Sequence, residues 1–172
     1  QGTYVADTDV STARKTRGLG AALTTNKINA GGDALTQADI DSALKSMADN
    51  GAPFENVVLF ANAANKQLIS SFYSNSLALA PRDRNIGGVN INTIETDFCE
   101  MGVVYERHIP ATQVFLIDMN FCKPVFLDIP GKGHFFVEPL AQSGAAYKYQ
   151  VYGEFGLEYG PEQFHGNIHS TA

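Results

Sequence analysis

The stretch YKYQVYGEFGLEYG, residues 147–160, alternates apolar and polar side chains along most of its length. Odd positions from Tyr147 to Tyr159 are mostly apolar and even positions mostly polar, which is typical of a strand with one buried face. At about 3.3 Å per residue such a strand would run roughly 43 Å, about the diameter of a compact chain of this length. We therefore expect a strand as long as the molecule, its odd face packed on the core, with bends at Gly153 and Gly156.

Composition limits the class of protein. The chain has 172 residues and 44% apolar residues, enough for one globular domain, or one and a fragment, with a real core. Its formal net charge is −6 and it has no basic block, which argues against a face that grips nucleic acid or reads its sequence. No apolar run approaches the length of about 18 residues that spans a membrane, so no membrane partner is expected.

The cysteines indicate the redox environment of the chain, and the first residue bears on whether the chain is part of a longer protein. Cys99 and Cys122 are too few for a disulfide scaffold at this length, so we expect reduced thiols near the core and a reducing compartment. The chain starts with Gln1, in a segment without a clear element. We interpret it as the carboxyl-terminal part of something longer.

The helical patterns lie early in the chain. Thr36, with Asp39 three residues on, predicts the start of a helix that ends near Gly51. The apolar run NVVLFAN, residues 56–62, predicts a strand covered on both faces. Asn62 is placed to cap a second helix, which runs to about residue 73.

The strand-like patterns lie late in the chain. They cover residues 89–96, 101–109, 112–119, 123–129 and 133–139, and they end in the long strand. The runs 112–119 and 123–129 are expected to pair with each other, and GKGH at 131–134 is expected to be a turn. Helices first and strands later predict an α+β fold.

Few residues point to metal or cofactor chemistry. Cys99, Cys122, His165 and His169 could in principle bind zinc, but the two cysteines lie far apart in sequence with no local knuckle. Two tail histidines near the surface are the favoured interpretation. No cofactor is expected.

Catalytic carboxylates are equally weak candidates. Glu154 and Glu158 would lie roughly 13 Å apart along a strand, beyond the separation of about 5 to 9.5 Å that glycosidases use. Asp118 ends an apolar run, where a catalytic carboxylate could sit, but a bond to the following turn is the favoured role. Since no nucleophile motif is present either, we expect no enzyme activity.

Three segments in order resemble a known family. They are NVVLFANAANKQLISSF at 56–72, ETDFCEMGVVYERHIPATQVFLIDMNF at 95–121, and GEFGLEYGPEQFHGNI at 153–168. Together they resemble the major capsid proteins of tailed bacteriophages, in a branch also carried by prophages, over roughly residues 30–170. The resemblance implies the tailed-phage capsid fold, here a carboxyl-terminal portion that lacks the amino-terminal arm and the extended loop.

The resemblance also implies domains and a function. Residues 1–24 would be a remnant of the peripheral domain, 25–133 the axial-type domain, and 134–172 the returning strands of the peripheral domain. The chain would be a structural subunit of an icosahedral shell around packaged DNA, forming pentamers and hexamers with copies of itself. Scaffolding or portal proteins would be further partners, and the shell would be assembled in the bacterial cytoplasm and form the virion capsid.

Other functions stay open at this point. A soluble β-rich module that binds carbohydrate or protein could use exposed tyrosines such as Tyr73 and Tyr152. A hydrolase using Glu154 or Asp118 is a third hypothesis.

Candidate interface residues lie in two places. The segment 74–88 predicts an exposed loop that is either an interaction loop or a solvated connector, and it carries Arg82, Asp83 and Arg84. The polar face of the long strand supplies Lys148, Glu154 and Glu158.

Overall fold

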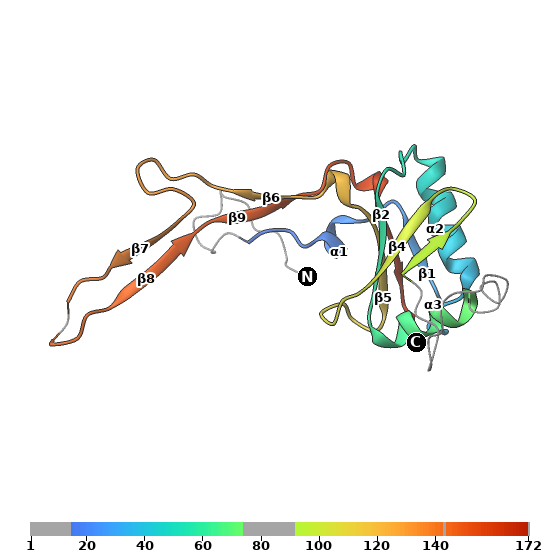
Figure 1. Cartoon of the computed structure of the whole chain (residues 1–172), viewed down its shortest axis with the longest axis horizontal. Coiled ribbons are helices and arrows are strands. Elements are labelled where there is room, and N and C mark those ends of the chain that lie inside the picture. The colour runs from blue at the N-terminus through green and yellow to red at the C-terminus, as the bar shows by residue number, and fades with distance from the viewer. Residues whose placement is uncertain (1–14, 74–91, 143, 172) are drawn as a thin grey trace, which may run out of the picture.

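A six-stranded sheet and a long two-stranded arm make up the part of the chain that the structure describes, residues 15–73, 92–142 and 144–171 of a computed structural model. Figure 1 shows the arm extending far from the sheet, with helices α2 and α3 beside the sheet at the other end. The order of elements, helices early and strands late, confirms the predicted α+β class.

Helix α2 (Gln37–Asp49) begins and ends where the sequence predicts. The N–H of Asp39 donates to Oγ1 of Thr36 at 3.3 Å, and the N–H of Thr36 donates to Oδ2 of Asp39 at 2.9 Å, which forms a capping box. Gly51, with φ +81°, follows the last turn in the left-handed region that glycine adopts readily. One face of this helix packs on the sheet through Ile40, Ala43, Leu44 and Met47, all fully buried.

Strand β2 (Val57–Ala61) and helix α3 (Ala63–Tyr73) follow as predicted, and Asn62 caps the helix by accepting from the N–H of Asn65 at 3.0 Å. Only one face of β2 is fully covered, through Val57, Leu59 and Ala61. The other face is half-buried, so the expectation of full cover on both faces was wrong. Phe60 on this half-buried face lines a cavity that is described below.

The sheet has the strand order β1-β10-β5-β2-β4-β3. Its remaining strands are β1 (Lys27–Asn29), β3 (Thr93–Glu95), β4 (Glu100–Tyr105), β5 (Gln113–Asp118) and β10 (Gly166–His169). Strand β10, from the end of the chain, runs parallel to β1 and antiparallel to β5. Strands from near the two ends of the described chain are therefore neighbours in one sheet, although they lie far apart in sequence.

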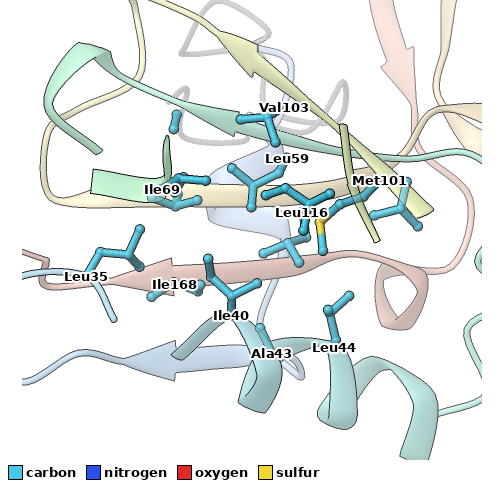
Figure 2. Close-up of a cluster of buried hydrophobic side chains, with 14 of the residues drawn as sticks. Leu35, Ile40, Ala43, Leu44, Leu59, Ile69, Met101, Val103, Leu116 and Ile168 are labelled. Carbon is cyan, nitrogen blue, oxygen red and sulfur yellow. The ribbon is translucent and has the colours of Figure 1, made fainter. Parts of the chain in front are cut away.

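The main core lies between this sheet and helices α2 and α3 (Figure 2). Figure 2 shows Leu59, Leu116 and Ile168 on neighbouring strands beside Ile40 and Leu44 of α2. A smaller cluster of Leu23, Phe115 and Ile117 lies on the other face, next to the short helix α1 (Leu19–Ala22).

The predicted hairpin of residues 112–119 with 123–129 does not form. Strand β5 pairs with β10 and β2, while β6 (Lys123–Phe126) pairs with β9 (Phe155–Glu158). A 3-10 turn at Met119–Phe121 redirects the chain out of the sheet, because the side chain of Asp118 caps it by accepting from the N–H of Asn120. Apolar periodicity predicted both strands but could not show which partner each would take.

The arm, residues 122–160, is a hairpin made of two ladders in series. Next to the sheet, β6 pairs with β9; farther out, β7 (Phe135–Pro139) pairs with β8 (Tyr149–Gly153). Between β6 and β7 the chain makes an excursion closed by a bridge between Ile129 and Gly133, so the predicted turn at GKGH is confirmed. A 3-10 turn at Glu162–Phe164 leads back from the arm into β10.

The long strand of residues 147–159 does not pack on the core, and that expectation was wrong. It is divided at Glu154 into β8 and β9, next to the predicted bend at Gly153, whereas Gly156, the other predicted bend, pairs with Val125 inside β9. Its odd side chains are mostly exposed. Val151 is 73% exposed and Phe155 is 67% exposed. Alternation reports that one face of a strand is apolar, but it does not say what covers that face.

Candidate assembly surface

One face of the arm is a continuous apolar surface. In an antiparallel ladder, directly paired residues point to the same side of the sheet. The pairs Val137 with Val151 and Phe126 with Phe155 therefore each place two apolar side chains on one face. We call this surface the apolar stripe; it consists of Pro124, Phe126, Phe135, Val137, Pro139, Tyr149, Val151, Phe155 and Leu157.

The stripe crosses the interruption between the two ladders. The rings of Phe126 and Phe135 lie 5.8 Å apart, edge to face, which joins the inner ladder to the outer one. Gly153 stands opposite Phe135 in the register, and a Cβ atom at Gly153 would lie 2.2 Å from the Phe135 ring. Glycine at this position lets the ring lie flat across the ribbon and keeps the stripe unbroken.

The exposed area of the stripe is large for a protein of this size. In the described residues, twelve of the sixteen exposed large apolar side chains lie between positions 125 and 157, so exposure of apolar surface is concentrated on the arm. The stripe alone exposes on the order of 700 Å², given about 150–250 Å² for each large aromatic side chain. The largest apolar patch on a typical monomer is about 300–600 Å². The stripe is therefore a surface that another protein surface should cover.

The opposite face of the arm is mixed: it carries Val125, Phe136 and Tyr152 beside polar side chains that are bonded to one another. Glu138 accepts from Nζ of Lys132 at 2.9 Å and from Nε2 of Gln150 at 3.4 Å, and the hydroxyl of Tyr152 donates to Glu154. The hydrogen bond and positive charge of Lys132 lower the pKa of Glu138 below its ordinary value. This face, which we call the polar face, therefore carries charged and amide side chains that the stripe lacks.

A cavity of about 370 Å³ opens where the arm meets the sheet. It lies over the half-covered second face of the sheet and is mostly apolar; its lining includes Leu19, Phe60, Ile109, Phe115, Ile117 and Leu157. Leu157 also belongs to the apolar stripe. The stripe and this cavity therefore meet at Leu157, so apolar side chains follow one another from the outer ladder to the sheet.

The root of the arm is held by a buried histidine. His165 is fully buried just before β10; its Nδ1 accepts from the N–H of Asp118 at 3.1 Å, and its Nε2 donates to the carbonyl oxygen of Tyr159 at 2.6 Å. Asp118 is the last residue of β5, where the chain leaves for the arm, and Tyr159 stands where the arm returns. The His165 ring is thus bonded both to the chain where it leaves the sheet for the arm and to the chain where it returns.

Asp118 stabilises the same region with its carboxylate. Its oxygens accept from the N–H groups of Glu55 at 3.0 Å, Asn56 at 3.3 Å and Asn120 at 3.1 Å. A buried carboxylate needs such partners because burying a charge without them is costly. The predicted role for Asp118, a bond to the following turn, is confirmed.

The returning chain is also fastened to the segment before β1. The carboxylate of Glu162 accepts from the N–H and hydroxyl groups of both Thr24 and Thr25, at 2.5 to 3.3 Å. Partial burial raises the pKa of Glu162, but these hydrogen bonds outweigh burial and leave it below its ordinary value. Buried Asn26 donates to the carbonyl oxygens of Gln163 and His165, so three consecutive residues clamp this return.

The predicted interface residues fall in different places. Lys148, Glu154 and Glu158 all lie on the polar face of the arm rather than on the stripe, and Glu158 stands opposite Lys123 in the ladder. Arg82, Asp83 and Arg84 lie outside the described residues. Lys148, Glu154 and Glu158 are therefore not part of the apolar stripe.

The zinc site and a catalytic role for Asp118 do not fit the geometry. Both ring nitrogens of His165 are taken by backbone groups, and His165 is buried rather than near the surface, contrary to the prediction for a tail histidine. Among the described residues, no group of three or more His, Cys, Asp or Glu side chains is arranged to hold a metal ion. The carboxylate of Asp118 is buried and bonded to three amides, so it cannot reach a substrate.

The two cysteines are free and half-buried, and each packs against a core cluster, which confirms their expected place near the core. Burial raises the pKa of both thiols, and the nearby charge of Asp118 raises it further. Tyr152, proposed as an exposed binding tyrosine, packs on Phe136 with ring centroids 5.6 Å apart and is bonded to Glu154. In the described part of the chain, no helix is long and apolar enough to cross a membrane.

The sequence alone did not predict half of the apolar stripe. The strand pattern indicated the apolar odd positions of β8 and β9, but we expected them in the core, and the pattern did not align Phe126, Phe135 and Val137 with them. The signal was present, because residues 133–139 also alternate. What the pattern lacked was the register that places these side chains on the same face.

Comparison with solved structures gives the same architecture. A chain of the holo-SrpI encapsulin complex from Synechococcus elongatus PCC 7942 matches with a TM-score of 0.61 and 12% sequence identity. The match covers 90% of this chain and 56% of the encapsulin chain, so this chain spans little more than half the length of that protein. At this identity the likeness shows the fold alone. No curated protein matches the chain.

The sheet with its projecting arm therefore shares the fold of that encapsulin chain, and the α+β capsid fold expected from the sequence is confirmed. The chain belongs to the SU10 major capsid protein family, whose sequence profile matches residues 1–172. That family is structural, so the chain is a structural protein and not an enzyme.

Proposed function

We propose that the chain is a structural subunit of an icosahedral phage capsid and that it assembles with copies of itself through the arm. Family membership supports a capsid role, and the apolar stripe is the observation that carries the assembly surface. The subunit would form pentamers and hexamers in a shell around packaged DNA, in the virion.

The stripe supports assembly for a physical reason. A two-stranded ribbon on its own is marginally stable in water, and the outer ladder has no third strand or helix among the described residues. A standard protein interface buries about 800 Å² on each partner, which is close to what the stripe exposes. Covering the stripe would both stabilise the arm and join subunits.

The domain division is part of the same proposal. Residues 25–133 would be mainly axial and residues 134–172 mainly peripheral, with 1–24 belonging to the peripheral domain. Strand β10 complicates this boundary, because it lies in the same sheet as β1 and β5. We therefore amend the division: the arm, residues 122–160, would be the peripheral element, and the six-stranded sheet, with β10 included, would be the axial one.

The predicted charged residues would act around the stripe. Lys148, Glu154 and Glu158 lie on the polar face of the arm, where charges set the register and choice of partner rather than supply most of the affinity. Arg82, Asp83 and Arg84 would contribute to contacts around the capsomer. Scaffolding and portal proteins would be further partners, and assembly would take place in the bacterial host cytoplasm.

The test uses the protein in its natural length and electron microscopy of purified particles. Val137→Asp with Val151→Asp places two carboxylates on the stripe, and we expect shells, rings and tubes to disappear. The matched control, Val137→Ile with Val151→Ile, keeps both side chains apolar and β-branched and should assemble. Normal shells from the aspartate variant would remove the stripe from the interface, and a wild-type protein that never assembles would overturn the capsid function itself.

A further inference from the structure

The two edges of the arm differ in what their backbone can offer to another strand. In an antiparallel ladder, pairs that exchange both backbone hydrogen bonds alternate with pairs whose N–H and C=O groups point outward. The N–H of Leu127 donates to the carbonyl oxygen of Glu154 at 3.0 Å, and the N–H of Leu140 donates to that of Lys148 at 2.9 Å. Along the register from these two pairs, the even residues of β8 and β9 bond inward and the odd residues point their backbone groups outward.

The edge formed by β6 and β7 is blocked. Its outward positions include Pro124 and Pro139, which have no N–H to donate, and the excursion closed by Ile129 and Gly133 divides it into two short strands. Prolines and short edge strands are two ways in which proteins keep a sheet edge from pairing with another chain. This edge of the arm is therefore protected against the addition of a further strand.

The edge formed by β8 and β9 has no such protection. The two strands follow each other along the arm with only Glu154 between them (Figure 1). Each of its outward residues has an N–H: Tyr149, Val151, Gly153, Phe155 and Leu157. The hydroxyl of Thr16 donates to the carbonyl oxygen of Phe155 at 3.2 Å, so a segment from outside the ladder already bonds to the inner end of this edge. In the described part of the chain neither ladder has a third strand, so no strand there pairs with the row from Tyr149 to Gly153.

We propose that this unprotected edge pairs with the same edge of a second copy of the chain, so that two arms form one four-stranded sheet about a two-fold axis. Antiparallel pairing of identical edges is self-complementary, as a two-fold contact requires. A two-stranded ribbon is marginally stable in water, whereas three or more strands with an apolar face can be stable on their own. Because directly paired residues share a face, the two apolar stripes join into one broader surface. The place of this pair in a shell rests on the proposed capsid function.

Charge complementarity selects the register of the pairing. When Val151 lies opposite Val151 of the second copy, Lys148 lies opposite Glu154 of the second copy. The two-fold axis repeats this contact, so an opposite-charge pair closes each end of the new ladder. Opposite charges directly across a ladder stabilise it, and like charges there destabilise it.

The neighbouring registers fit less well. A register centred on the next outward residue toward the sheet would need the carbonyl oxygen of Phe155, which already accepts from Thr16. A register centred on the next outward residue toward the tip would place Lys148 opposite Gln150 and remove both charge pairs. The register centred on Val151 avoids both problems.

Cysteine cross-linking of this chain tests the pairing at two matched positions. Val137 and Val151 are directly opposite in the outer ladder, both exposed and both on the stripe, but they lie on different edges of the arm. In a background with Cys99 and Cys122 replaced by alanine, mild oxidation should convert most of the Val151→Cys chain to a disulfide-linked dimer. Partners that exchange backbone bonds have Cα atoms about 5.5 Å apart, within the range that a disulfide spans. The Val137→Cys chain should stay monomeric.

The comparison separates pairing through the edge from contact through the stripe. Two stripes packed face to face would bring both positions near a second copy, whereas edge pairing brings only Val151 there. The proposal is overturned if Val151→Cys gives no dimer or if Val137→Cys gives as much.

Proline substitution tests the backbone bonds directly. Val151→Pro removes an outward N–H without removing a bond inside the ladder, and Val137→Pro does the same on the blocked edge. In sedimentation velocity, Val151→Pro should lose the dimer that the wild type and Val137→Pro form. Equal behaviour of the two proline variants overturns the pairing.

Charge reversal tests the register and decides if a proline variant does not fold. In the cross-linking assay, Lys148→Glu should lower the yield of the Val151→Cys dimer, because like charges then face each other at both ends of the ladder. Adding Glu154→Lys restores opposite charges and should recover the yield. An unchanged yield with Lys148→Glu, or no recovery in the double variant, overturns the proposed pairing. These assays report on unassembled chain, so their failure leaves the capsid proposal standing, and absence of shells from the protein of natural length leaves the pairing standing.

Discussion

The N–H of Asp118 donates a hydrogen bond to Nδ1 of His165 at 3.1 Å, which joins the last residue of β5 to the residue before β10. These two residues are 47 positions apart, and the whole arm lies between them. The bond closes the base of the arm and sets where its apolar stripe is presented. The proposed assembly surface of this capsid protein thus lies on an arm whose base is closed by a contact inside the sheet domain.

The stripe should tolerate a charge in the free chain but not in the shell. Val151 is 73% exposed, so Val151→Asp should change the free energy of unfolding of the sheet domain by no more than about 0.5 kcal/mol. In the protein of natural length the same change should abolish particles, because it buries an unpaired carboxylate in the interface. Urea unfolding and sedimentation velocity measure the two effects. Val151→Ile is the control, and equal loss of particles with isoleucine would contradict the prediction.

Gly153 should be required by the ring of Phe135. A Cβ atom there would lie 2.2 Å from Cδ1 of Phe135 and 2.9 Å from the carbonyl oxygen of His134, so Gly153→Ala should destabilise the outer ladder by about 1–3 kcal/mol. Amide hydrogen exchange at residues 137 and 151 would report the loss of protection.

Gly156 supplies the matched control for this change. A Cβ atom at Gly156 would meet nothing within 4 Å, so Gly156→Ala should leave exchange on the arm nearly unchanged. Adding Phe135→Ala to Gly153→Ala should restore part of the protection. If both alanine variants exchange alike, the steric explanation fails.

Glu162 should make stability depend on pH in a defined direction. Burial raises the pKa of Glu162, but hydrogen bonds from Thr25 and Thr24 outweigh it, so the folded pKa lies below the unfolded value of about 4.3. The stabilisation is therefore present above about pH 4.3 and is lost as pH falls through the lower folded pKa.

Comparison with Glu162→Gln isolates this contribution. We expect the variant to be less stable than the wild type by about 1 kcal/mol at neutral pH, with the difference shrinking below pH ~4. Urea unfolding across that range measures both. A difference that grows toward acid pH would reverse the assigned sign.

Asn26 should be among the most sensitive polar residues. Its side chain is fully buried; it donates to Gln163 and His165 and accepts from Ser46 at 2.8 Å and Asn50 at 2.9 Å. Asn26→Leu would leave those four partners without their bonds, so we expect a loss of about 2–4 kcal/mol in the free energy of unfolding. Lys27→Leu, next in sequence and exposed, should cost no more than about 0.5 kcal/mol. Thermal unfolding of both variants compares them, and similar midpoints would refute the role given to Asn26.

The sequence alone determined the helix ends and strand faces that depend on interactions between neighbouring residues. Thr36 and Asp39 form their capping box within one turn of α2, so the helix start can be read directly from the sequence. The strand patterns likewise determined that residues 149–158 have one apolar face, since alternation is a property of the strand itself. Even the bend beside Gly153 follows from the residue type.

Only the tertiary structure decided what that apolar face does. Its odd side chains would fit a core equally well, and the choice between core and interface depends on the register of β6 with β9 and on where the chain turns after Asp118. The burial of His165 is also tertiary, because its partners Asp118 and Tyr159 come from the two ends of the arm. Hydrogen bonds and packing between residues far apart in sequence leave no local pattern, so the sequence determined the apolar face of the arm, whereas the fold decided that this face points away from the core.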